Sequence, residues 1–139
     1  MKHQMIPRVG AKMLIPYILI FALYVQFHGD YGPGGGFQAG VIFSAAFVLY
    51  ALIYGLRATE RVMPRRLMEI LVCLGVLLYA GVGVASMFLG GNFLDYDVLA
   101  HDPVHGQHYG LLLIEFGVGL TVFAVMLTIF YKFAGRGRT

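Results

Sequence analysis

Gly32-Pro33-Gly34-Gly35-Gly36-Phe37-Gln38-Ala39-Gly40 is the most informative segment of the sequence, because it separates two apolar runs. The runs cover 11–27 and 36–56, and each is long enough to enter or cross a bilayer. Proline fixes one φ angle, and consecutive glycines reach backbone angles closed to other residues. The stretch therefore predicts a tight turn back into the membrane. Amide groups of the next helix's first turn are left to face an anion, water or another subunit.

The composition is that of an integral membrane protein. Of the 139 residues, 59% are hydrophobic and only 12% are charged, and the mean hydropathy is +0.77. Soluble proteins carry about 25% charged residues, and a soluble domain of this size could not bury so much apolar surface. The single cysteine, Cys73, excludes a disulfide within the chain.

Hydropathy predicts four transmembrane helices, at about 11–27, 36–56, 67–89 and 109–131. At 1.5 Å per residue they extend about 26, 32, 35 and 35 Å, against a hydrocarbon core of about 30 Å. Helices satisfy their own backbone in lipid, and the sequence lacks the alternation of a β-barrel. We therefore expect an all-α four-transmembrane-helix bundle, forming a single membrane domain over 1–139.

Charge predicts how the helices are oriented. All ten lysines and arginines lie in the N-terminal tail, the 57–66 loop or the C-terminal tail, whereas 28–35 and 90–108 contain none. The positive-inside rule then places both termini in the cytoplasm. Because these basic residues lie next to helix ends, we expect them to contact membrane lipid and not nucleic acid.

Glu115 is the principal candidate for chemistry. It lies within the fourth span with apolar residues on both sides, where a carboxylate costs at least a few kcal/mol unless it is neutral, paired or hydrated. Such an acid suits a group that exchanges a proton or binds a cation. The alternative is a structural acid that hydrogen-bonds to a neighbouring helix or reaches water.

Three other ionisable residues are weaker candidates. Glu69 follows Arg65 and Arg66 at helical spacing, which favours an ion pair at the membrane surface. His28 and Asp30 close the first span and begin the glycine-rich loop.

A metal or haem site is not expected. His101, His105 and His108 have spacing that could support a metal on a helix, but Pro103 and Gly106 interrupt the run. Paired axial ligands within the spans are missing, which argues against haem. We therefore expect no metal and no cofactor.

The turn is expected to shape the re-entry into the membrane and a contact with another subunit. Gly36 and Gly40 form a small-xxx-small pair, a spacing typical of close helix packing. The residues assigned to the turn and this contact are Pro33, Gly34, Gly35, Gly36, Phe37, Gln38 and Gly40.

One deep acid and no deep base make an incomplete ion path. Such a path normally needs a relay of polar groups, often on helices related by internal repeats. This favours a subunit of a larger membrane complex. The rival interpretation is a small proton-coupled transporter that works as a homodimer, in which the second copy supplies the second acid.

Two segments resemble one family. PGGGFQAG, from Pro33 to Gly40, and EFGVGLTV, from Glu115 to Val122, are similar to segments of the B subunit (MrpB/MnhB) of multisubunit Mrp-type Na⁺/H⁺ antiporters. The resemblance implies a non-enzymatic, multi-pass subunit of the bacterial plasma membrane, needed for assembly and for exchange of Na⁺ and H⁺ by a hetero-oligomeric complex. It also implies that Glu115 belongs to the ion path. Related segments in membrane-bound hydrogenase complexes leave a subunit of an energy-converting complex as an alternative.

Overall fold

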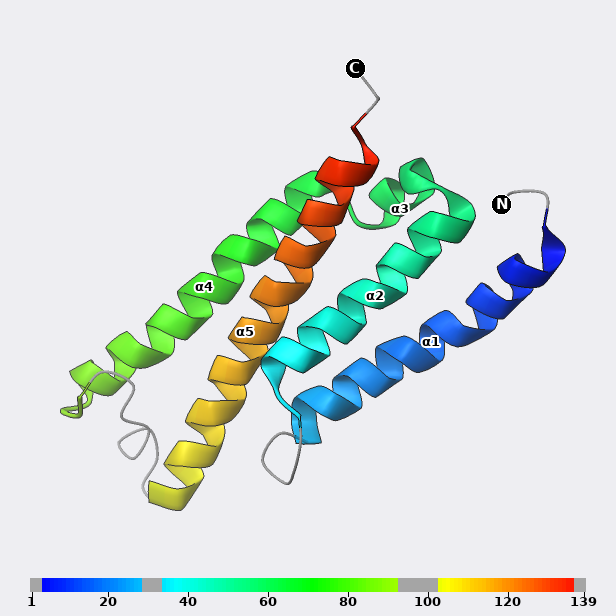
Figure 1. Ribbon diagram of the computed structural model, residues 1–139. Coiled ribbons are helices and arrows are strands. Elements are labelled where there is room, and N and C mark those ends of the chain that lie inside the picture. The colour runs from blue at the N-terminus through cyan, green and yellow to red at the C-terminus, as the bar shows by residue number, and fades with distance from the viewer. Residues whose placement is uncertain (1–3, 29–33, 93–102, 137–139) are drawn as a thin grey trace.

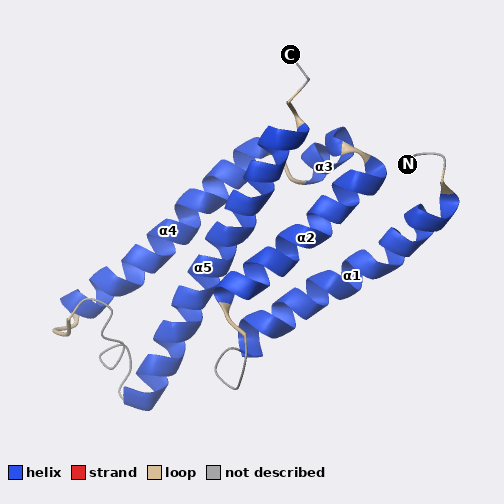
Figure 2. Ribbon diagram, in the orientation of Figure 1, coloured by secondary structure: helices blue, strands red, loops and turns tan. Residues whose placement is uncertain are grey.

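The structure is a computed structural model that describes residues 4–28, 34–92 and 103–136, with side chains in the last segment described from Tyr109. Asp30, Pro33 and His101 lie outside the described residues. Figure 2 shows only helices and loops in the described part. Four helices are long and apolar enough to cross a membrane, so the prediction of an all-α protein with four membrane-spanning helices is confirmed.

The helix boundaries follow from local chemistry. The helices are α1 (Met5–His28), α2 (Gly36–Tyr54), α3 (Leu56–Val62), α4 (Arg65–Phe88) and α5 (Pro103–Ala134). Pro103 stands at the first position of α5, where its missing N–H costs no helical hydrogen bond.

The short helix α3 was not predicted, because the sequence indicated a loop there. Gly55 has φ +98°, a backbone conformation that side chains disfavour, and this residue ends α2. Its amide still donates to the Ala51 carbonyl, and a new helix then starts at Leu56 in another direction. The second span is therefore shorter than the hydropathy pattern indicated.

The four spans lie side by side in the order α1, α2, α5, α4 (Figure 1). α2 and α5 thus have a neighbour on both sides, whereas α1 and α4 form the edges. Both termini lie at the end of the molecule that carries α3 (Figure 1). We call this end the terminal end and the opposite end, where α2 begins, the glycine-turn end.

The apolar core lies along α5 towards the terminal end. Leu56, Met68, Phe123, Leu127 and Tyr131 are buried there against one another. The ring of Phe43 from α2 meets that of Phe123 edge to face, at 4.9 Å between centroids. Many other large apolar side chains are exposed, as expected for helices surrounded by lipid.

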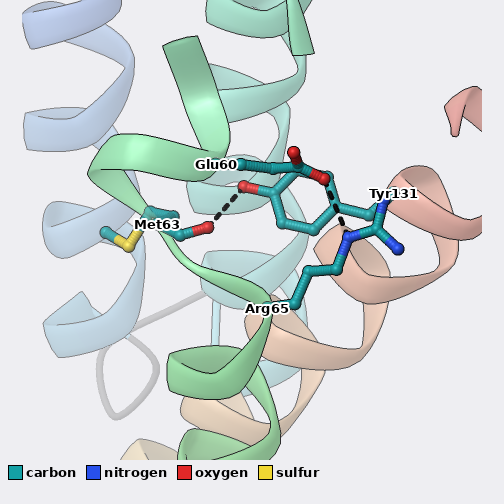
Figure 3. A network of polar contacts seen from close by, with 4 residues as sticks. All are labelled: Glu60, Met63, Arg65 and Tyr131. Carbon is teal, nitrogen blue, oxygen red and sulfur yellow. Dashed lines mark hydrogen bonds and ion pairs between the residues drawn. The ribbon is translucent and has the colours of Figure 1, made fainter. Parts of the chain in front are cut away.

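Polar contacts join α3, α4 and α5 at the terminal end (Figure 3). The buried Tyr131 hydroxyl donates to the carbonyl of Met63, in the α3–α4 connection, at 2.8 Å. The Arg65 side chain donates from Nε to Glu60 Oε1, also at 2.8 Å, and its guanidinium lies 6.0 Å from the Tyr131 ring centroid. These contacts fix α3 against the ends of α4 and α5. We call Glu60, Met63, Arg65 and Tyr131 the terminal network.

Candidate functional site

The structure brings Glu115 and the glycine turn together. Gly36, the first residue of α2, packs on the backbone of Glu115 so closely that a Cβ on Gly36 would overlap the Glu115 carbonyl oxygen. A Cβ on Gly35 would lie 3.8 Å from Glu115 Oε1. The half-buried acid on α5 therefore extends its carboxylate to the start of α2.

The start of α2 is a suitable neighbour for a carboxylate. The Ala39 amide donates to the Gly35 carbonyl at 3.0 Å, which begins the helical hydrogen-bond series. The amides of the first turn precede this bond and have no helical acceptor. Together with the helix dipole, these amides attract negative charge. This attraction at the start of α2 explains how a carboxylate at Glu115 can be accommodated within an apolar span.

Glycine is required in this turn for two separate reasons. Gly35 has φ +135°, a conformation that other residues rarely adopt, and its amide donates to the Val25 carbonyl of α1 at 3.3 Å. Gly36 instead has no room for a side chain. The turn is thereby tied to α1 through Gly35 and to α5 through Gly36.

Gln26 is a further member of this site that sequence reasoning missed. It lies on α1 and is only 6% exposed. Its Oε1 is 2.8 Å from the position that a Cβ on Gly119 would take, and the Gly36 carbonyl oxygen is 3.1 Å from that position. Since Gly119 follows Glu115 by one helical turn, Gln26, Gly36 and Glu115 meet at one junction. The signal that could have found Gln26 is an amide within an apolar span.

The Gln26 amide has unused hydrogen-bonding capacity. Its Nε2 is buried and has no acceptor among the described residues. A cavity of about 300 Å³ adjoins Gln26 and is otherwise lined mainly by apolar side chains of α1, α2, α4 and α5. A buried donor without an acceptor costs about 1–3 kcal/mol, so an acceptor supplied by water or a partner would stabilise it. We call Gln26, Gly35, Gly36, Glu115 and Gly119 the Glu115 junction.

The remaining turn residues divide between the interior and the surface. Gly40 packs on α5, where a Cβ would lie 2.6 Å from the Gly119 carbonyl oxygen. Gly36 and Gly40 therefore both pack closely against α5 of the same chain. Phe37 and Gln38 are exposed, which leaves them accessible to a partner, and Gly34 is half-buried before the helix.

The weaker candidates lie away from the junction or outside its contacts. Glu69 is exposed on the first turns of α4, at the terminal end. The predicted ion pair is wrong, since within the described residues Arg65 pairs with Glu60 and Glu69 pairs with neither arginine. α3, which hydropathy did not reveal, brings Glu60 to Arg65. His28 ends α1 and stacks on Tyr24, with 5.0 Å between ring centroids.

The donor groups described at the junction are a carboxylate, an amide side chain and backbone groups. Nowhere in the described ranges do three or more His, Cys, Asp or Glu side chains gather in a way that could hold a metal ion. The described junction can exchange a proton at Glu115 or offer oxygen atoms to a cation. Those are the two chemistries that its residues support.

Comparisons with known proteins identify the family of this chain. The family model described as "Domain related to MnhB subunit of Na+/H+ antiporter" matches residues 6–128, which include every member of the junction. Antiporter subunit mnhB2 of Staphylococcus haemolyticus is 30% identical over 137 residues, which covers 96% of each chain. The protein of the same name from Staphylococcus aureus strain Newman is 31% identical over the same length and coverage. The resemblance drawn from PGGGFQAG and EFGVGLTV is confirmed, and the chain belongs to the family of domains related to the MnhB subunit of Na⁺/H⁺ antiporters.

Proposed function

We propose that this chain is a small membrane subunit of a multisubunit Na⁺/H⁺ antiporter and that Glu115 lies in or beside the ion path. Family membership supports the first part. The observation that carries the second part is the convergence of Glu115, the start of α2 and the buried Gln26 amide on one junction. Polar groups that meet at membrane depth typically mark ion or proton pathways.

The function rests on a complex and not on this chain alone. Among the described residues of the four spans, Glu69 and Glu115 are the carboxylates, and they lie towards opposite ends. A relay through the membrane therefore needs ionisable groups from partner subunits. The exposure of Phe37 and Gln38 supports a role for these turn residues in contacting such a partner. Family membership favours this role over a hydrogenase-type subunit or a homodimeric transporter.

The test of the ion-path role is Glu115→Gln. This change keeps the size and much of the hydrogen bonding but removes the titratable proton. We expect an assembled complex that has lost most of its Na⁺-dependent dissipation of a pH gradient in everted vesicles. Glu115→Asp should retain part of the activity with a shifted pH profile, because the carboxylate survives at a shorter reach.

The control is Glu60→Gln, which removes a carboxylate at the terminal end and should leave exchange near the parent level. Native gels verify assembly of each variant. An assembled Glu115→Gln complex that exchanges normally at every pH would reduce Glu115 to a packing residue. The family role would then stand and the site assignment would fail.

The orientation that we propose has both termini in the cytoplasm and the chain in the bacterial plasma membrane. The basic residues of α1, α3, α4 and α5 cluster at the terminal end, and the positive-inside rule places that end inside. In a background without Cys73, cysteines at Asp30 or Asp97 should react with an impermeant maleimide in intact cells. A cysteine at Arg61 should not, and labelling there would reverse the orientation.

A further inference from the structure

A groove with a basic lining lies at the terminal end, between α1 and α2. The first half of α1 lies beside the last half of α2, and a groove of about 640 Å³ separates them. Arg8 and Lys12 line it from α1, together with Ile15 and Pro16, while Tyr50 and Tyr54 line it from α2. None of these residues belongs to the Glu115 junction.

The charge in this groove has one sign. Arg8 and Lys12 are one helical turn apart and therefore share a face of α1, and both side chains are exposed. The helix on the other side, α2, contains no charged residue. The groove thus presents two cationic groups with no carboxylate among its lining residues.

We call Arg8 and Lys12 the basic rim of the groove, and Tyr54 holds Arg8 in position there. Its hydroxyl donates to the Arg8 backbone carbonyl at 3.2 Å, and the Arg8 guanidinium lies 5.4 Å from the centroid of the Tyr54 ring. A cation over an aromatic face is attracted by the ring. The contacts join the start of α1 to the end of α2 and keep the Arg8 charge at the groove. Beyond this rim, the groove is lined by Ile15, Pro16 and the Tyr50 ring, which are mainly apolar.

A basic rim followed by an apolar lining is complementary to an amphipathic anion, which has a negatively charged head and an apolar tail. Basic side chains at helix ends lie at the depth of lipid head groups, and basic pockets between transmembrane helices bind anionic head groups. An apolar groove that continues from the basic rim suits an acyl chain. We propose that the groove binds one anionic phospholipid, with its phosphate on Arg8 and Lys12 and an acyl chain against Ile15, Pro16 and Tyr50.

The test is native mass spectrometry of the purified full chain in detergent. Phosphatidylglycerol and phosphatidylcholine with the same acyl chains are added separately, and we expect the chain to retain one phosphatidylglycerol in preference. Arg8→Gln with Lys12→Gln should weaken that retention by about 25-fold, since each basic side chain near a membrane surface contributes about fivefold.

The matched control is Arg57→Gln with Arg61→Gln. It removes the same charge from the same end of the molecule but outside the groove, so it should keep the phospholipid. Equal loss in this control would overturn the proposal, because retention would then reflect the overall charge. Equal retention of the two lipids would also overturn it, since the groove would then select no head group.

A second variant tests the acyl-chain half without changing charge. Ile15→Trp should fill the groove and lower retention in a chain that keeps its helical circular dichroism. Unchanged retention in this variant would contradict the proposed position of the acyl chain.

Two other outcomes would identify a different occupant of the groove. Full displacement of the phospholipid by glycerol phosphate would identify a free-phosphate site. Dimer masses in place of lipid adducts would identify a second copy of this protein as the occupant.

Discussion

The two ends of this molecule are held together in opposite ways. At the Glu115 junction, helices approach because Gly36 and Gly119 have no side chains, and backbone lies directly on backbone. At the terminal network, helices are joined by long side chains, with Tyr131 reaching Met63 and Arg65 reaching Glu60. One end therefore depends on direct contact between backbones, which leaves no room for a side chain at Gly36, whereas the other depends on side chains that similar ones can replace.

Gly36→Ala tests the glycine-turn end with the largest expected effect. The added methyl group would overlap the carbonyl of Glu115, and a backbone group cannot move aside as a side chain can. We expect a loss of at least about 3 kcal/mol of stability, at the upper end for overpacked sites, with failed complex assembly. Thermal unfolding of the purified chain and native gels of the complex measure the two effects.

Gly81→Ala is the matched control for Gly36→Ala. Gly81 also lies inside a membrane-spanning helix, but a Cβ there would meet nothing within 4 Å. Alanine is preferred over glycine in a helix by about 1 kcal/mol, so this variant should be neutral or more stable. If both alanine variants behave alike, close approach does not hold the junction.

Gly119→Ala tests the same end with a smaller effect. The new methyl group would lie 2.8 Å from Gln26 Oε1, and an amide side chain can rotate away. It would also lie 3.1 Å from the Gly36 carbonyl oxygen, which would have to shift by only a few tenths of an ångström. We expect a loss of about 1–3 kcal/mol. In a double-mutant cycle with Gln26→Ala, the double variant should lose less than the sum of the single losses, since the two residues are in contact. Additive losses would show that Gln26 does not pack on Gly119.

Tyr131→Phe and Glu60→Gln test the terminal network, and Glu60→Gln has the smallest expected effect. It keeps the buried ring but removes the hydroxyl that donates to Met63, which should cost about 1–3 kcal/mol. Glu60→Gln breaks the partly exposed pair with Arg65 and should cost at most about 1 kcal/mol. Thermal unfolding should show that the Tyr131→Phe variant is less stable than the Glu60→Gln variant. A Tyr131→Phe chain as stable as the parent would mean that ring packing alone holds this end.

Glu115 and Glu69 show how far sequence reasoning reached. Both were recognised as ionisable residues in apolar helices, because hydropathy is read from consecutive residues. The contacts of Glu69 were predicted incorrectly, since the predicted pair with Arg65 considered only residues on the same helix. Arg65 found its partner on α3, a helix that begins only because Gly55 ends α2. Gln26 was missed because burial depends on which helix lies beside it.

The all-α membrane fold, the position of the turn and the family could be predicted from the sequence, because each of these follows from local composition or from short motifs. Three contacts could not be predicted from the sequence, because they depend on how the helices pack: Gly36 lies on Glu115, Gln26 completes their junction, and Tyr131 binds the α3–α4 connection. The reason is the order of the helices. α5 inserts between α2 and α4, although α4 is the next membrane span after α2 along the chain. The contacts across those interfaces therefore depend on packing between residues far apart in the sequence.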